Sequence, residues 1–340
     1  MTLANDLSST GAPPVARTVP PARLLIGVMV AAAVLALTLA TRAPLSTTVL
    51  GLIAFGVLHN VLEIRYVAGR FAALLTGRFL ALLLGLITGI MLCRLAIGVW
   101  PVGARYAEIG LGYLILGVGS WIGLGRRWVW IALAVLALAA TASFRFPGYH
   151  FVMLTHLHNL VPLIFLWDWA RRIPDAWARA AFRLTQVVWV VAVPVLILAG
   201  GVDRWLTAGP GVVRQFVGDG SAVIAVSAPP QAASLVGLRF LVAFAFLQTM
   251  HYVVWVGFLP KFAPDAAAAF DARVPWLRGG RAWAFGLLGG AFLSLLFFSD
   301  YSQGKALYGA LASYHAYLEF PVLLALLMHG AGVRDRLPQP

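Results

Sequence analysis

The feature that most constrains this chain is a series of long apolar runs joined by mostly short polar links. A helix that crosses a bilayer needs about 20 predominantly apolar residues, and backbone polar groups in hydrocarbon must be satisfied within the segment, which favours helices. The sequence therefore predicts an all-α, polytopic transmembrane helical bundle. It should have about ten spans, at 22–41, 44–64, 75–100, 105–124, 127–145, 149–169, 183–200, 232–258, 281–299 and 305–329.

The composition supports a membrane location. Of the 340 residues, 61% are hydrophobic and 11% are charged, whereas soluble domains carry about 25% charged residues. The net charge of +13 would suit nucleic acid, but most arginines lie between apolar runs and no basic block with interleaved aromatics occurs. We expect a lipid bilayer and no nucleic acid as partner. The single cysteine, Cys93, excludes an intrachain disulfide.

The chain divides into one membrane domain and two tails. Residues 1–21 are rich in Ser, Thr, Ala and Pro, which predicts a disordered tail, followed by a single transmembrane domain at 22–330 and a C-terminal tail at 331–340. Of the longer links, 201–231 is expected to cap one side of the bundle. The other, 261–280, is expected to form a short interfacial helix.

The arginines predict the orientation. Cytoplasmic loops carry an excess of Lys and Arg, and most basic residues, such as Arg70, Arg127 and Arg172, fall on the side that holds both ends of the chain. We therefore expect an inner-membrane, multi-pass protein with both termini in the cytoplasm. The very short links near 42–43 and 125–126 predict tight antiparallel hairpins.

Histidines and glutamates inside the apolar runs carry the chemistry. His59 and Glu63 are four residues apart, as are His315 and Glu319, and a third run holds His251. Residues with this spacing share one helix face, with about 5–6 Å between Cβ atoms. An isolated carboxylate in hydrocarbon needs a partner. These five residues are therefore predicted to be metal ligands in a bundle core, in preference to a packing role.

A further run supplies two histidines in alternative positions. His156 and His158 are two residues apart, so they project about 200° from each other. We favour His158 as the metal ligand, with Asn159 as a hydrogen-bonding group behind it, and leave His156 open as an additional ligand. Gln248 and Tyr314 adjoin the motifs and are expected to position O₂ or substrate.

Other ionisable groups fit the membrane interface. His150 lies near a run end and is expected to be interfacial, and Asp168 is expected to pair with Arg171 and Arg172. Arg65 would pair with a buried carboxylate if its helix continues past 64.

The ligand types suggest a metal. Imidazole with carboxylate and without thiolate suits non-haem iron, as one or two ions, with zinc or copper possible. Haem held by axial histidines is a further possibility. The catalytic residues themselves stay unknown at this stage.

At these residues the sequence resembles the Brp/Blh family of integral membrane β-carotene 15,15′-dioxygenases. The resemblance covers four short segments: His59 to Glu63, the segment with His156 and His158, the segment with His251, and His315 to Glu319. It implies an iron-dependent enzyme that cleaves a carotenoid. The leading hypothesis is therefore a membrane-embedded non-haem iron oxygenase acting on a lipophilic substrate, carotenoid or isoprenoid-like. The alternatives are a haem-binding redox or haem-handling protein and a proton-coupled transporter.

Overall fold

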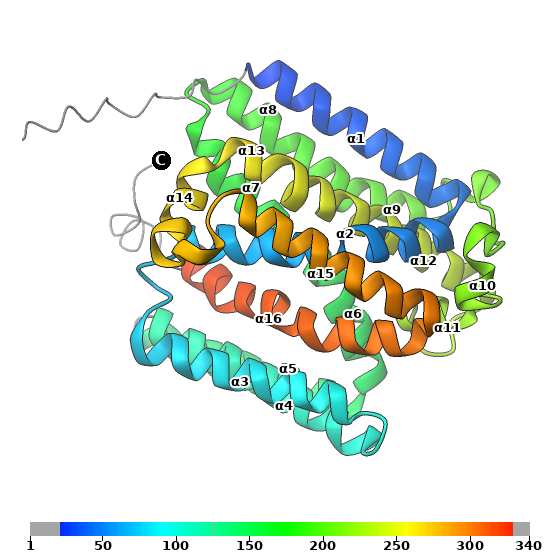
Figure 1. Ribbon diagram of the computed structural model, residues 1–340, viewed down its shortest axis with the longest axis horizontal. Helices are drawn as coiled ribbons and strands as arrows, with labels where there is room; N and C mark the ends of the chain where they lie inside the picture. The colour runs from blue at the N-terminus through cyan, green and yellow to red at the C-terminus, as the bar shows by residue number, and fades with distance from the viewer. Residues whose placement is uncertain (1–20, 125, 329–340) are drawn as a thin grey trace, which may run out of the picture.

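The computed structural model describes residues 21–124 and 126–328, and within these ranges all regular secondary structure is helical. The predicted tails fall outside the described residues, apart from Pro21. Each predicted apolar run is a helix or a pair of stacked helices, as Figure 1 shows. Their bounds are α1 Ala22–Arg42, α2 Pro44–Arg70, α3 Gly77–Ala96, α4 Pro101–Gly123, α5 Arg126–Arg145, α6 Pro147–Leu160 with α7 Pro162–Trp169, α8 Ala176–Val187 with α9 Val193–Leu198, α12 Ser234–Tyr252 with α13 Leu259–Phe262, α15 Gly280–Ser299 and α16 Tyr301–Met328.

The chain is a polytopic helical bundle. Within the described residues, 8 of the helical segments are long and apolar enough to cross a membrane. The helices α4 and α16 have 23 and 28 residues and are not among these eight. Their polar groups matter, because α16 carries Lys305, His315 and Glu319.

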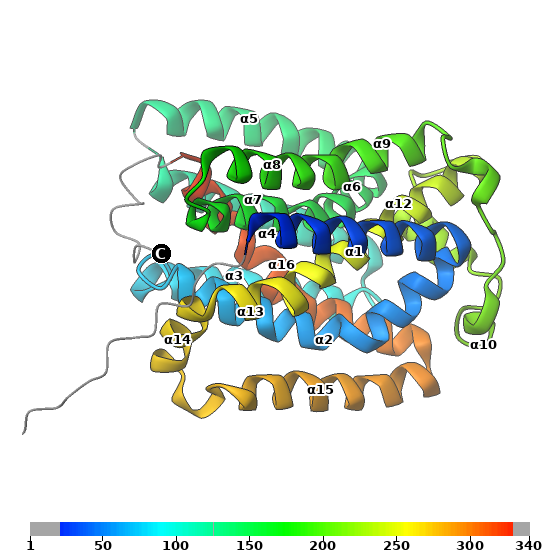
Figure 2. The same ribbon diagram turned by 90° about the horizontal axis from the view of Figure 1, so that it is seen from above.

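The two most enclosed spans are α2 and the α12–α13 segment. Each span contains an apolar stretch of 18 residues, and the share of that stretch buried inside the bundle differs widely. It is 67% for α12–α13 and 56% for α2, but 17% for α3 and 6% for α5. Figures 1 and 2 show α2, α12 and α16 in the middle of the bundle, while α5 and α15 lie at opposite faces. Side chains on α2, α12 and α16 are therefore the ones best shielded from lipid.

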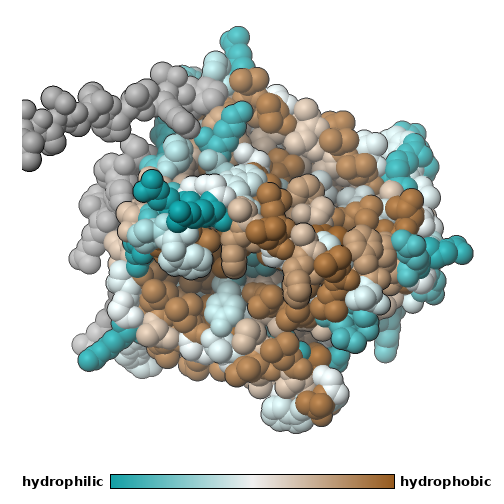
Figure 3. Space-filling model, in the orientation of Figure 1, coloured by the Kyte–Doolittle hydropathy of each residue, from teal (hydrophilic) through white to brown (hydrophobic). Residues whose placement is uncertain are grey.

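The outer face is apolar where lipid would contact it. Large side chains such as Leu138, Phe292 and Leu295 are 75%, 71% and 69% exposed. Figure 3 shows hydrophobic residues over the middle of the bundle and hydrophilic residues towards its two ends. Since a soluble protein rarely exposes so wide an apolar belt, this surface fits hydrocarbon.

Prolines fix where several helices begin. Pro44, Pro101 and Pro147 each occupy the first turn of a helix, where a missing N–H group breaks no helical bond. Only Ala43 separates α1 from α2, so the predicted tight hairpin of these two helices is confirmed, as Figure 1 shows.

Both longer links fold as expected. The link after α9 contains α10 (Arg214–Val217) and α11 (Ser221–Ser227), and it packs Val213 and Val223 against Leu45 and Leu241 at one end of the bundle. The second link contains α14 (Pro264–Arg273). A Cβ atom at Gly69 would lie 1.9 Å from the Ala266 carbonyl oxygen, so only glycine lets α14 approach α2 this closely.

Arg65 pairs across helices. Helix α2 continues to Arg70, and Arg65 donates to both carboxylate oxygens of Asp271 on α14, at 2.7 and 2.8 Å. The predicted pairing of Arg65 is thus confirmed, with a half-buried acid at the end of the bundle as its partner.

Asp168 has a different main partner from the one predicted. Its carboxylate lies 3.0 Å from Arg70 on α2 and 3.9 Å from Arg171. Arg172 instead pairs with Asp265 on α14, at 2.7 Å. The sequence-based pairing with Arg172 was wrong because α7 ends in a 3₁₀ turn over Ala170–Arg172, which changes the direction of that side chain.

An intramembrane pair escaped sequence analysis. Glu108 on α4 is 3% exposed and accepts hydrogen bonds from Arg94 on α3 at 2.6 and 2.9 Å and from the Tyr317 hydroxyl at 3.1 Å. Charges at this depth are expensive unless paired. This triad therefore joins α3, α4 and α16.

We expect Glu108→Gln to destabilise the folded protein by about 3 kcal/mol, because removing one partner of a buried pair leaves the other charge uncompensated. The free energy of unfolding in detergent would measure this. Asp203→Asn is the control, since Asp203 pairs with Arg239 at an exposed loop, and it should change stability little. Equal effects of the two variants would contradict a structural role for the Glu108 pair.

Candidate metal centre

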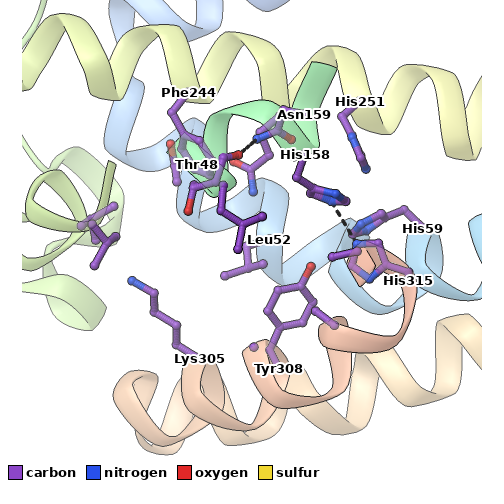
Figure 4. Close-up of a pocket in the computed structure, with 18 of the residues that line it drawn as sticks. Thr48, Leu52, His59, His158, Asn159, Phe244, His251, Lys305, Tyr308 and His315 are labelled. Carbon is purple, nitrogen blue, oxygen red and sulfur yellow. Dashed lines mark hydrogen bonds between the residues drawn. The ribbon is translucent and has the colours of Figure 1, made fainter. Parts of the chain in front are cut away.

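Four histidines from four separate helices meet in the bundle interior. They are His59 on α2, His158 on α6, His251 on α12 and His315 on α16, and one ring nitrogen from each lies within 4.8 Å of the others. Figure 4 shows the four rings gathered at one end of a pocket. The predicted convergence of these histidines in the bundle core is confirmed.

Two of the four histidine helices change their backbone geometry close to the cluster, and a third contains a proline. The α6 helix ends at Leu160, just after His158, and Pro162 begins α7. A π-helix over Val253–Phe258 follows His251, and Pro321 lies within α16. Proline removes a helical hydrogen bond, and π-helical turns occur frequently at functional sites. The backbone is therefore irregular where the ligands converge.

Hydrogen bonds orient two of the rings. His59 Nδ1 lies 3.0 Å from the Phe55 carbonyl oxygen, and His158 Nδ1 lies 3.0 Å from Glu319 Oε2. In both cases the Nδ1–H group donates, which leaves Nε2 free to act as a ligand. Metal-binding histidines usually have this arrangement, with a carbonyl or carboxylate behind the ring.

Two Nε2 atoms of the cluster lie close to each other. His158 Nε2 and His315 Nε2 are 3.1 Å apart. Two nitrogens that each lie about 2.0–2.1 Å from one ion, at an angle of roughly 90–109°, are about 2.8–3.4 Å apart. The spacing of this pair therefore matches two ligands of one cation.

Several buried polar atoms in the cluster lack hydrogen-bond donors or acceptors. Glu63 and Glu319 are both 0% exposed. Glu63 faces the Glu319 carboxyl group, and among the residues that the structure describes neither of its oxygens has a hydrogen-bond donor. Both ring nitrogens of His251 and Nδ1 of His315 also have no hydrogen-bond partner within the described ranges, and Glu63 Oε2 lies 3.5 Å from His251 Nε2. Since buried polar groups are normally satisfied, a cation fits this set of donors.

The structure separates the two neighbouring histidines of α6. His158 belongs to the cluster, whereas His156 Nε2 lies 2.8 Å from the Ser227 carbonyl oxygen, and its ring packs against Phe240 and Phe244. The expected divergence of these side chains is confirmed. His156 connects α6 to α11. The geometry therefore does not support a role for His156 as an additional metal ligand.

The three polar residues expected to assist the metal ligands, Asn159, Gln248 and Tyr314, form hydrogen bonds outside the histidine cluster. Asn159 donates to the Thr155 carbonyl oxygen at 3.0 Å, and Gln248 donates to the Tyr252 hydroxyl at 2.9 Å. Both line the pocket beside the cluster. Tyr314, in contrast, shares a hydrogen bond of 2.7 Å with Thr88 on α3. We therefore assign Tyr314 to helix packing.

His150 lies apart from the cluster. It is half-buried, and its Nδ1 atom lies 3.0 Å from the Ser143 hydroxyl oxygen at the α5–α6 junction. Its predicted place outside the metal site thus agrees with the structure.

A cavity of about 320 Å³ adjoins the four histidines. Sequence reasoning missed two of its tyrosines. The Tyr252 ring centre lies 4.8 Å from that of His59, and Tyr308 also lines the cavity. Tyr308 precedes His315 by seven residues, or two helical turns, so its place on the same helix face could have been read from the spacing.

No protein-family model, curated protein or solved structure matches this chain. The geometry of the histidine cluster is therefore the basis for any functional assignment.

Proposed function

We propose that this chain is a membrane-embedded, metal-dependent oxygenase that acts on a lipophilic substrate, with non-haem iron as its metal. One observation carries the proposal: four histidines and two buried carboxylates converge at the end of a largely apolar cavity. The enclosed position suits a substrate drawn from the bilayer. The resemblance to carotenoid dioxygenases at the same residues supports the same substrate class.

The donor set favours iron over other metals. Imidazole and carboxylate ligands that leave coordination positions open are typical of non-haem iron proteins, in which the metal supplies O₂ activation. His59, His158, His251 and His315 would hold the ion. Glu63 would neutralise its charge or bind it directly, and Glu319 would fix the orientation of His158 through the Nδ1 hydrogen bond.

The cavity walls provide what a lipophilic substrate needs. Leu52, Leu154 and Phe244 line the cavity, and Gln248 with Tyr252 forms a polar edge beside the histidines. Pockets of this kind, with apolar walls and a few placed polar groups, are typical of small-molecule sites. These side chains would exclude water from the reacting part of the substrate.

Haem binding and proton-coupled transport are less favoured. A porphyrin leaves its iron two axial positions, whereas four imidazole nitrogens lie within 4.8 Å of one another here, so two of the rings would occupy the place of the porphyrin. A proton relay through the histidines and glutamates is compatible with their burial. It requires no metal, and this separates it from an oxygenase.

Metal analysis and oxygen uptake test the proposed function. We expect protein purified in detergent to retain about one iron per chain, in line with one cluster of four ligands, and to consume O₂ together with an added carotenoid or isoprenoid. His158→Ala should abolish both. A Soret band would indicate haem, and protein that is active in proton transport without metal would indicate a transporter. Tightly bound zinc without oxygen uptake would also refute the oxygenase.

A further inference from the structure

The cavity has a cationic end as well as a histidine end. It extends from the four histidines towards α11 and the start of α16, where Val223, Val226 and Lys305 line it. Figure 4 shows Lys305 at one end, the histidines at the other, and Leu52 and Tyr308 between them. The site is therefore elongated, with different chemistry at its two ends.

Lys305 differs from the other basic residues within the spans. Arg94 pairs with Glu108, and Arg239 pairs with Asp203. Lys305 is half-buried, and its ammonium group has no ion pair or hydrogen bond among the residues that the structure describes. A cation that is partly withdrawn from water gains most from an anionic partner. The part of the chain that the structure describes supplies none at this position.

One face of α16 connects the two ends. Lys305, Tyr308, Ala312 and His315 all line the cavity, and they follow one another at intervals of three or four residues, as side chains on one helix face do. From Lys305 to His315 the helix rises roughly 15 Å. A ligand anchored at Lys305 would thus reach the histidines with a part of its chain about that far from its anionic group.

We propose that the cavity binds a long-chain lipid carboxylate, with its head group at Lys305 and its apolar chain directed towards the histidine cluster. Lys305 lies in the second turn of α16, near the end of the span, where a charged head group can remain close to the membrane surface. Leu52, Leu154 and Phe244 enclose the chain. The inference specifies a substrate class for the proposed function, and any reaction of the bound lipid rests on that function. Binding itself does not require the metal.

A comparison of palmitate with hexadecanol, the alcohol of the same chain length, tests this site. Both compounds would displace a fluorescent fatty acid from full-length, metal-free protein in nanodiscs. We expect wild type to bind palmitate at least about tenfold more tightly than hexadecanol, which corresponds to about 1.4 kcal/mol. Lys305→Met should abolish this preference, and Lys305→Arg should retain most of it.

Two controls make the result specific. Arg204→Met removes a basic residue from an exposed loop, and it should keep the preference for palmitate. Lys305 has no hydrogen-bond or ion-pair partner among the described residues, so the melting temperature of Lys305→Met should match that of wild type.

Each outcome decides between the two proposals. An equal affinity of wild type for palmitate and hexadecanol, or an undiminished preference in Lys305→Met, overturns the carboxylate site. A Lys305-dependent preference in a protein that never consumes O₂ supports the site and refutes the oxygenase.

Discussion

Replacing His158 with alanine should strip the protein of its metal, whereas replacing His156 with alanine should leave the metal in place. Both histidines lie in α6, but only His158 joins the four-histidine cluster. His156 contacts the Ser227 carbonyl oxygen and two phenylalanine rings. We expect metal affinity to fall at least about 100-fold for His158→Ala, because even residues behind the ligands typically contribute 10–100-fold.

Metal content after purification and competition with a chelator would measure the difference. The two variants lose the same side chain at nearly the same depth, so a general effect of removing an intramembrane histidine should appear in both. Both proteins should retain their helical content, since apolar packing holds the bundle together. Equal metal retention in wild type and His158→Ala would leave the cluster with a structural role only.

Replacing Glu63 with glutamine should stabilise the metal-free protein and weaken its metal binding. Glu63 is fully buried and faces a second carboxyl group, Glu319, and in the described part of the chain no Lys or Arg side chain pairs with it. In the metal-free state this arrangement is unfavourable, so a neutral amide should add about 1–3 kcal/mol to the free energy of unfolding. With metal bound, the lost charge should lower the affinity.

Thermal unfolding with and without metal would test both effects. A ligand present at about 1,000 times its dissociation constant stabilises the folded state by about 4 kcal/mol, so wild type should show a large shift in melting temperature and Glu63→Gln a smaller one. Glu108→Gln is the matched control. The same substitution there removes the partner of Arg94 and should destabilise the protein. If both variants lose stability in the absence of metal, Glu63 does not have the role that we assign to it.

The sequence was most informative where one physical rule dominates. Hydrocarbon requires long apolar helices, so the runs predicted the helices of the bundle, and the His-x-x-x-Glu spacing in α2 and α16 placed both pairs on single helix faces. The divergence of His156 and His158 followed from the helical repeat alone. The side of the membrane on which each terminus lies stays a prediction from the arginine distribution.

Other features depend on how each helix is rotated about its axis, which a single sequence does not encode locally. The partner of Arg94 is Glu108 and that of Asp168 is Arg70, and both pairs form between helices. The cavity is the volume that side chains from several helices leave free, so neither its extent nor the position of Lys305 within it could be predicted. Tyr314 was misjudged for the same reason, since its ring turns towards α3.

The ion pairs around α14 imply that the two ends of the bundle differ mechanically. Arg65 and Arg172 both form ion pairs with acidic residues on α14, and Arg70 on α2 forms one with α7. Ion pairs therefore connect the helices at this end. At the opposite end, α10 and α11 cover the bundle mainly through small apolar contacts, and Figure 1 shows them well away from α14. Cohesion at the α14 end therefore depends on three ion pairs, whereas cohesion at the α11 end depends more on apolar packing, with the His156–Ser227 hydrogen bond beside it.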